Sequence, residues 1–310
     1  MHTCKEALFY NRLLYILNMD KVKDFWLKFF KGDREMINKT IDLWGEFPYI
    51  SKGTDGFRPT LDTYILKGDK NRGAVLICPG GGYGFTSPRE AEPIALKFNA
   101  AGFHAFVVYY SVAPDRHPQQ LMDVSRAMCI LRENSKDWKI DGDKIAVVGF
   151  SAGAHLVANL GVHWDKYYLK DVPGIKLGMN KPNALILGYP VITSGTYAHR
   201  GSFDNLLGDN ADKQLLQEMS LELNVSEETP PTFLWHTFSD DLVPVENSLL
   251  FAQALRKKKV PFELHIYPEG PHGLSLANEE TEEGDIGLYP NVATWMELCI
   301  TWLTNLFLKK

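Results

Sequence analysis

The stretch that decides the fold of this chain is Lys144-Ile145-Ala146-Val147-Val148-Gly149-Phe150-Ser151-Ala152-Gly153. Its first half is a β-branched apolar run that predicts a buried strand, and helix-forming residues follow at 154–160. The pattern G-x-S-x-G between a strand and a helix is typical of a nucleophile elbow, which exposes a serine hydroxyl above the sheet edge. An ordinary glycine–serine turn is the alternative. Partner residues farther along the chain, in the right order, favour the elbow and make Ser151 the candidate nucleophile.

Two later segments supply the partners that an acyl-transferring serine needs, which are a base and a carboxylate that orients the base. A strand predicted at Thr232–Thr237 leads into an acidic turn, where Asp240 and Asp241 compete for the role of the acid. A second strand, Phe262–Tyr267, runs into a Gly/Pro-rich loop that carries His272. Histidine suits the base because its ordinary pKa lies near neutrality, and loops after parallel strands often carry catalytic groups.

A glycine-rich loop supplies the expected donors for the negative oxygen that forms during acyl transfer. The predicted strand Ala74–Cys78 runs into Pro79-Gly80-Gly81-Gly82-Tyr83, and adjacent glycines let the backbone approach a ligand closely. We expect the backbone N–H groups of Gly81 and Gly82 to donate, together with that of Ala152 at the start of a helix. A phosphate-binding loop is the alternative, but the lysine of that motif is absent here.

Residues expected to contact substrate lie beside these segments. Ser87-Pro88-Arg89-Glu90 has the pattern of a capping box, which would start a helix close to the glycine loop. The segment 191–229 is expected to form a small cap with a short helix near Asp212–Leu221. The candidate substrate-binding residues are Tyr83, Arg89, Tyr189 and Phe203.

Taken together, these stretches resemble the α/β-hydrolase fold, and more narrowly the acetyl esterase/lipase family with its acetylxylan-esterase-like and feruloyl-esterase-like sugar hydrolases. The resemblance runs from about residue 60 to the C-terminus and rests on Cys78–Tyr83, Arg89–Pro93, Tyr109–Pro114, Gly149–Leu156, Asp240–Pro244 and Gly270–Gly273. It implies that Ser151 is the nucleophile and His272 the base. It also implies that Asp240 is the acid, since many members carry Asp-x-x-Val-Pro at this turn. Pro79 replaces the histidine common in the family's glycine loop, so this loop must be supported differently.

The whole chain has the size and pattern of one large α/β domain. Its 310 residues are 45% hydrophobic, and strands that alternate with helices predict a mostly parallel sheet covered by helices on both faces. The other predicted strands are Thr60–Leu66, His104–Tyr110, Ile145–Gly149 and Ala184–Tyr189. The predicted helices are Pro88–Ala101, Pro118–Asn134, Ala152–His163, Glu246–Lys258 and Asn291–Leu308.

The predicted domains are an N-terminal helical arm at 1–45 and a catalytic domain at 46–310. The arm carries aromatic residues at helical spacing and is expected to pack on the domain or on a partner subunit, which allows a homo-oligomer. The apolar stretch 1–18 suggests a signal peptide, but Asn11 and Arg12 interrupt it and no small-residue cleavage site follows. Met19 is an alternative start of the chain.

Composition narrows the class of protein. Four widely spaced cysteines without a C-x-x-C pattern predict reduced thiols in a cytoplasmic protein, with no disulfide framework and no zinc site. The net charge of −5 argues against a nucleic-acid partner, and no apolar run has the length of a membrane span. We expect neither a metal nor a cofactor.

The combined pattern predicts a serine esterase that acts on short acyl esters through an acyl-enzyme. By resemblance, its substrates are acetyl esters, with acetylated sugars as candidates. An amidase or peptidase with the same three residues is one alternative. A catalytically silent ligand receptor of the same fold is the other, although such receptors usually lose one of the three residues and this chain keeps them all.

Overall fold

The computed structural model describes residues 38–49, 51–53, 56–284 and 287–308. These residues belong to one compact unit, Asn38–Lys310. Most of the predicted arm at 1–45, including Cys4 and Met19, therefore lies outside the described residues. The described part of the arm holds a short strand, β1 (Thr40–Asp42), which the sequence pattern did not predict.

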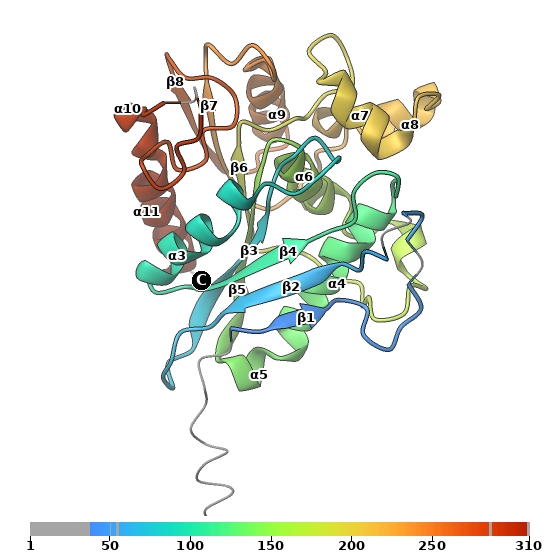
Figure 1. The fold of residues 1–310 in the computed structure, drawn as a ribbon, viewed down its shortest axis with the longest axis vertical. Helices are drawn as coiled ribbons and strands as arrows, with labels where there is room; N and C mark the ends of the chain where they lie inside the picture. Colours follow the sequence, from blue (N-terminus) through green and yellow to red (C-terminus); the bar gives the residue numbers. More distant parts are fainter. Residues whose placement is uncertain (1–37, 50, 54–55, 285–286, 309–310) are drawn as a thin grey trace, which may run out of the picture. The chain divides into compact units, whose positions relative to one another are not determined.

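An eight-stranded sheet with the order β1-β2-β4-β3-β5-β6-β7-β8 forms the centre of the described part of the chain (Figure 1). The pairs β1–β2 and β2–β4 are antiparallel, and every other neighbouring pair is parallel. The strands after β1 are β2 (Thr60–Tyr64), β3 (Arg72–Cys78), β4 (His104–Tyr109), β5 (Ile140–Phe150), β6 (Ala184–Gly188), β7 (Thr232–Thr237) and β8 (Phe262–Tyr267). The carboxyl ends of the parallel strands consequently meet at one edge of the sheet.

Helices cover both faces of the sheet, because its central strands are apolar on both sides. Residues of α3 and α11 share one core cluster with Val75, Ile77, Ala146 and Ile186. Helix α6 packs on the opposite face, where a methyl group at Gly161 would clash with Leu185. The helices are α3 (Glu92–Ala100), α4 (Gln119–Glu133), α5 (Ser135–Trp138), α6 (Ala152–His163), α7 (Arg200–Leu207), α8 (Lys213–Glu218), α9 (Glu246–Lys257), α10 (Pro290–Ala293) and α11 (Trp295–Leu308), with 3-10 turns η1 (Pro88–Glu90), η2 (Tyr167–Leu169) and η3 (Leu221–Leu223).

All seven predicted strands are present, and the helices at 152–163 and 246–258 agree with α6 and α9 to within a residue. The helix predicted at Pro88–Ala101 is instead divided into η1 and α3. Pro93 has no N–H to continue a helix from η1, so a new helix begins there. The predicted cap segment contains α8, whose N-cap Asp212 accepts a hydrogen bond from the Leu215 N–H at 2.8 Å, and also α7, which was not predicted.

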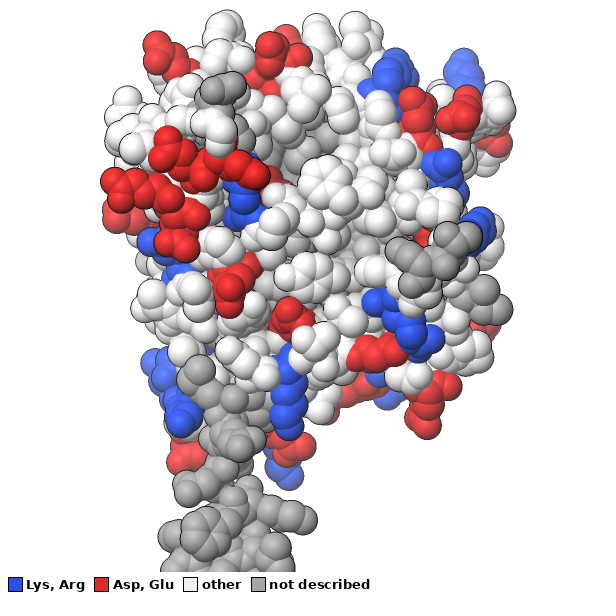
Figure 2. Space-filling view, viewed as in Figure 1, with Lys and Arg blue, Asp and Glu red and all other residues white. Residues whose placement is uncertain are grey.

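Lysine and arginine side chains are scattered among acidic ones on the face shown in Figure 2, and they form no extended basic area there. Within the described ranges, no helix combines the length and the apolar character needed to cross a membrane. Cys78, Cys129 and Cys299 are buried and unpaired, and burial raises the pKa of each thiol.

Candidate active site

The nucleophile elbow is present between β5 and α6. Ser151 has φ +52° and ψ −120°, a region that residues other than glycine rarely adopt. Backbone hydrogen bonds hold it there: the Ser151 N–H donates to the Gly188 carbonyl at 3.0 Å, and its carbonyl accepts from the N–H groups of Val191 and His155 at 3.2 and 3.1 Å. The strained turn is therefore fixed by the end of β6 and by the first turn of α6.

The two glycines of the elbow are required by close packing. A methyl group at Gly153 would lie 2.2 Å from the Cys78 carbonyl oxygen, and one at Gly149 would lie 2.4 Å from the Gly153 carbonyl oxygen. Neither contact is sterically allowed. The beginning of α6 can thus approach the end of β3, where the glycine loop starts, only because both positions lack a side chain.

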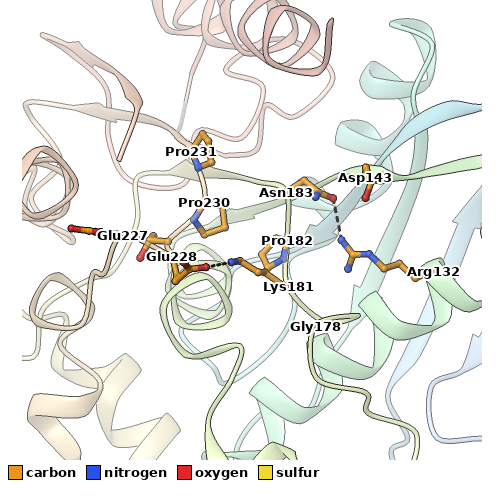
Figure 3. Close-up of a pocket in the computed structure, with 11 residues that line it drawn as sticks. Arg132, Asp143, Gly178, Lys181, Pro182, Asn183, Glu227, Glu228, Pro230 and Pro231 are labelled. Atoms are coloured by element: carbon orange, nitrogen blue, oxygen red, sulfur yellow. Dashed lines mark hydrogen bonds and ion pairs between the residues drawn. The ribbon is translucent and has the colours of Figure 1, made fainter. Parts of the chain in front are cut away.

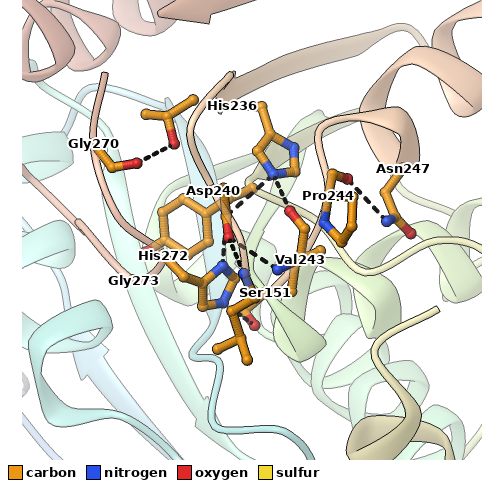
Figure 4. A network of polar contacts seen from close by, with 12 residues as sticks. Ser151, His236, Asp240, Val243, Pro244, Asn247, Gly270, His272 and Gly273 are labelled. Carbon is orange, nitrogen blue, oxygen red and sulfur yellow. Dashed lines mark hydrogen bonds and ion pairs between the residues drawn. The ribbon is translucent and has the colours of Figure 1, made fainter. Parts of the chain in front are cut away.

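Ser151, His272 and Asp240 form one hydrogen-bonded chain (Figure 4). The Ser151 Oγ lies 2.7 Å from His272 Nε2, and His272 Nδ1 lies 2.7 Å from Asp240 Oδ2. Ser151 follows β5, Asp240 follows β7 and His272 follows β8. The carboxyl ends of these strands share one edge of the sheet. With Nδ1 protonated toward the carboxylate, Nε2 can accept the serine proton.

The acidic turn after β7 presents Asp240 to the histidine and leaves Asp241 exposed to solvent. Asp240 Oδ1 accepts hydrogen bonds from the N–H groups of Leu242 and Val243 at 3.1 and 2.9 Å. Burial raises the pKa of Asp240, but the hydrogen bonds from His236 and His272 outweigh it and hold the pKa far below its usual range. Asp240 is consequently a buried, ionised acceptor.

His236 supports Asp240 through hydrogen bonds to the same turn. Its Nε2 lies 2.9 Å from the Val243 carbonyl oxygen and 3.3 Å from Asp240 Oδ2, and its Nδ1 lies 2.8 Å from Ser248 Oγ. No motif in the sequence distinguishes His236 from the other histidines of the chain.

The glycine loop lies against Ser151. A methyl group at Gly80 would be 3.1 Å from Ser151 Cβ. Gly81 and Gly82 have φ of +127° and +60°, which glycine adopts readily. Their N–H groups and that of Ala152 donate to no other atom of the described residues. Their role as donors to a negative oxygen stays a prediction.

Three contacts support the loop where the family's usual histidine is replaced by Pro79. The Tyr110 hydroxyl donates to the Pro79 carbonyl at 2.6 Å, and the Gly80 N–H donates to Glu90 Oε2 at 2.6 Å. The Tyr83 hydroxyl lies 2.8 Å from His155 Nδ1. The capping box predicted for 87–90 is therefore wrong. The Ser87 side chain makes no capping bond, and Glu90 turns inward because Gly80 offers it a buried donor.

The four candidate substrate-binding side chains are held within the protein. Tyr83, Tyr189 and Phe203 are at most 3% exposed. The Phe203 ring packs against His155 with centroids 5.4 Å apart, and the Arg89 guanidinium donates to the carbonyls of Gly273 and Thr281. These side chains support the loops around the triad, and their contact with substrate stays a prediction.

Helix α7 of the predicted cap packs on the glycine loop. Asn205 Nδ2 donates to the Gly82 carbonyl at 2.9 Å, and Arg116 donates to the carbonyls of Asp204 and Asn205. The Ser202 hydroxyl would lie 3.9 Å from a methyl group at Gly82. The role of Asn205 was missed because its segment carries no recognisable motif.

A cavity of about 470 Å³ lies at the amino ends of the parallel strands, away from the triad (Figure 3). The Arg132 guanidinium donates to the Gly142 carbonyl at 3.2 Å and to Asn183 Oδ1 at 3.0 Å, and Lys181 pairs with Glu228 at 2.6 Å. These contacts join the loops that precede β6 and β7, so we assign the cavity a structural role. No group of His, Cys, Asp and Glu side chains in the described ranges could hold a metal ion.

Curated relatives match most of this chain but less than half of their own length. The endo-1,4-beta-xylanase B of Butyrivibrio fibrisolvens is 42% identical over 248 residues, which are 78% of this chain and 39% of that protein. The acetylxylan esterase of Xylanibacter ruminicola is 32% identical over 209 residues, which are 66% of this chain and 41% of that protein. The chain thus spans about two fifths of these relatives.

Solved structures match most of this chain and nearly all of their own length. The acetyl ester-xyloside bifunctional hydrolase of Caldicellulosiruptor lactoaceticus is 42% identical with a TM-score of 0.79, covering 86% of this chain and 96% of that one. MGS-M1, an α/β hydrolase enzyme from a deep-sea metagenome library, is 34% identical with a TM-score of 0.66 and the same coverage. The BD-FAE family model matches residues 61–255, more than half of the chain. The predicted α/β-hydrolase fold and esterase resemblance are confirmed, and the chain belongs to the BD-FAE family.

Proposed function

We propose that this chain is a serine carboxylesterase that hydrolyses short acyl esters, and that acetyl esters of xylose-based sugars are its substrate class. The observation that carries the proposal is the chain of two 2.7 Å hydrogen bonds from Ser151 through His272 to the buried Asp240. Two of the similar proteins named above, an acetylxylan esterase and an acetyl ester-xyloside hydrolase, support the choice of acyl group and sugar.

The reaction proceeds through an acyl-enzyme. Ser151 Oγ attacks the ester carbonyl carbon while His272 Nε2 takes the hydroxyl proton, and Asp240 stabilises the imidazolium that forms. His272 then gives that proton to the alkoxide that leaves. Water, deprotonated by His272, attacks the acyl-enzyme in turn, releases the carboxylic acid and restores the Ser151 hydroxyl.

The glycine loop stabilises each tetrahedral intermediate. The N–H groups of Gly81, Gly82 and Ala152 receive the negative oxygen, and in comparable sites one such donor stabilises the transition state by about 3 kcal/mol. Ala152 adds the positive end of the α6 dipole. These donors are fixed before substrate arrives, because the loop is anchored through Tyr110, Glu90 and Asn205.

The test is hydrolysis of p-nitrophenyl esters from acetate to octanoate, followed by acetate release from acetylated xylo-oligosaccharides. We expect kcat/KM to be highest for acetate and to fall along the series. A maximum at octanoate would reject the short-acyl assignment, and turnover of peptide amides in place of esters would favour the amidase. Labelling by a fluorophosphonate probe, located by mass spectrometry, is expected at Ser151; an unlabelled protein would favour the silent receptor.

The two neighbouring aspartates give a matched pair of variants. Asp240→Asn should lower kcat about 10⁴-fold, because the amide disfavours the His272 tautomer that accepts the serine proton. Asp241→Asn should leave kcat within about twofold, since the side chain is exposed and makes no contact with His272. Equal losses in the two variants would show that the acid was assigned to the wrong residue.

A further inference from the structure

A second buried carboxylate lies next to the triad, and the mechanism above does not use its charge. Glu90 is only 4% exposed, at the end of η1. Its Oε2 accepts the Gly80 N–H at 2.6 Å, and its Oε1 accepts the Tyr189 hydroxyl at 2.5 Å. Both neighbours donate to Glu90, an arrangement that favours the ionised form of the carboxyl group.

Tyr189 carries this contact to the loop of the base. It follows β6 with φ +35°, and its own N–H donates to the Trp235 carbonyl at 2.8 Å. Its hydroxyl accepts the N–H of Ser275, three residues after His272, at 2.9 Å. Its ring lies 5.0 Å from the His272 imidazole, centroid to centroid. The phenol therefore contacts the base and also fixes the segment that follows it.

Further hydrogen bonds join the η1 turn to the loop that carries His272, here called the base loop. The Ser275 hydroxyl donates to the Arg89 carbonyl at 2.7 Å, the Trp295 indole donates to the Ser275 carbonyl at 2.9 Å, and the Arg89 guanidinium donates to the Gly273 carbonyl at 2.9 Å. The η1 turn thus holds the residues on both sides of Leu274. A displacement of Glu90 would move the glycine loop and the base loop together.

Few charged groups of the described residues lie near Glu90 and Tyr189. Burial raises the pKa of Glu90 above its usual value, and the bonds from Tyr189 and Gly80 and the nearby His272 and Arg89 offset only part of this rise. Burial, the charge of Glu90 and the bond to Glu90 raise the pKa of Tyr189, so the phenol keeps its proton. Tyr110 also faces Glu90. His272 is faced by Asp240 on its other side and by His199 of the cap segment.

We propose that Glu90 is a positioning residue for the esterase reaction: it fixes the glycine loop through Gly80 and the base loop through Tyr189. This inference rests on the proposed function. Glu90 touches no reacting atom and acts on the oxyanion donors and on the base through its two hydrogen-bond donors.

Glu90→Gln removes the charge and keeps the shape of the side chain. We expect kcat to fall about 100-fold with KM within about threefold, because the loops that carry the donors and the base shift. A merely structural role would lower the melting temperature and leave the kcat of the folded variant unchanged.

Two further variants test the links separately. Tyr189→Phe keeps the carboxylate but breaks the link to Ser275, so kcat should fall while KM stays within about threefold. Glu90→Asp keeps a carboxylate that can accept both hydrogen bonds and should recover part of the kcat that Glu90→Gln loses. Glu92→Gln, an exposed glutamate two residues away, is the matched control and should behave as wild type.

The outcomes distinguish this inference from the proposed function. Ester hydrolysis by the wild type together with an unchanged kcat in a folded Glu90→Gln variant would overturn the role of Glu90 alone. If that variant does not fold, a wild-type kcat and wild-type rate of fluorophosphonate labelling in Tyr189→Phe would overturn it. A wild type that neither hydrolyses esters nor reacts with the probe would overturn the proposed function and this inference with it.

Discussion

Replacing Ser151 with alanine is expected to lower kcat/KM for p-nitrophenyl acetate by about 10⁶-fold, because no other group can form the acyl-enzyme. The fold should persist: the backbone bonds that hold this turn involve only main-chain atoms of Gly188, Val191 and His155. Alanine also adopts positive φ no less readily than serine. Steady-state kinetics and a thermal melt on the same sample measure both effects.

Ser87→Ala is the matched control for this variant. Ser87 precedes η1 beside the glycine loop, and its side chain makes no capping bond, so kcat/KM should stay within about twofold. Residual activity of Ser151→Ala above about 1% of wild type would show that a different residue is the nucleophile, because contamination and uncatalysed hydrolysis fall well below that level.

Replacing His272 with alanine should cause a loss of the same size, about 10⁶-fold in kcat, since the serine then has no base to take its proton. The double variant Ser151→Ala/His272→Ala should be no slower than either single variant, because the two residues act as one unit. Measured rates of the three proteins give this comparison directly. A double variant that is slower by the product of the two losses would show that the residues act independently.

The control for the base is His265→Gln, which alters a half-buried histidine of β8 paired with Glu263 at 2.8 Å. Its kcat should match wild type to within a few-fold. Asp240 retains the N–H donors of Leu242 and Val243 when His272 is removed. The His272→Ala variant should therefore fold, and a cooperative melt would confirm that its inactivity is a loss of chemistry.

The meeting of Ser151, Asp240 and His272 could be predicted because each of them follows a strand with a clear local pattern. Apolar runs mark β5 and β7, and alternation marks β8; chain order then places the three residues at one edge of a parallel sheet. The choice between Asp240 and Asp241 came from resemblance to a family. Side-chain direction in a tight turn depends on the fold around it, so residue pattern alone could not decide it.

The contacts that the sequence did not reveal are those between residues far apart in the chain. Glu90 has the spacing of a capping box, but its partners are Gly80 and Tyr189, which is 99 residues away. A buried N–H and a phenol bind its carboxylate in place of the helix end. The hydroxyl of Tyr83 is likewise bonded to His155, 72 residues away, and its contact with substrate stays a prediction. Local patterns do not record such long-range competition.

The hydrogen bond between Ser151 and His272 spans 121 residues, and this distance has a consequence for partial products of synthesis. Ser151 and the glycine loop have both been synthesised by the end of α6, but His272 lies beyond β8 (Phe262–Tyr267). A chain that stops before β8 carries a serine with no group to activate it. If the proposed mechanism holds, interrupted translation should therefore yield fragments without esterase activity.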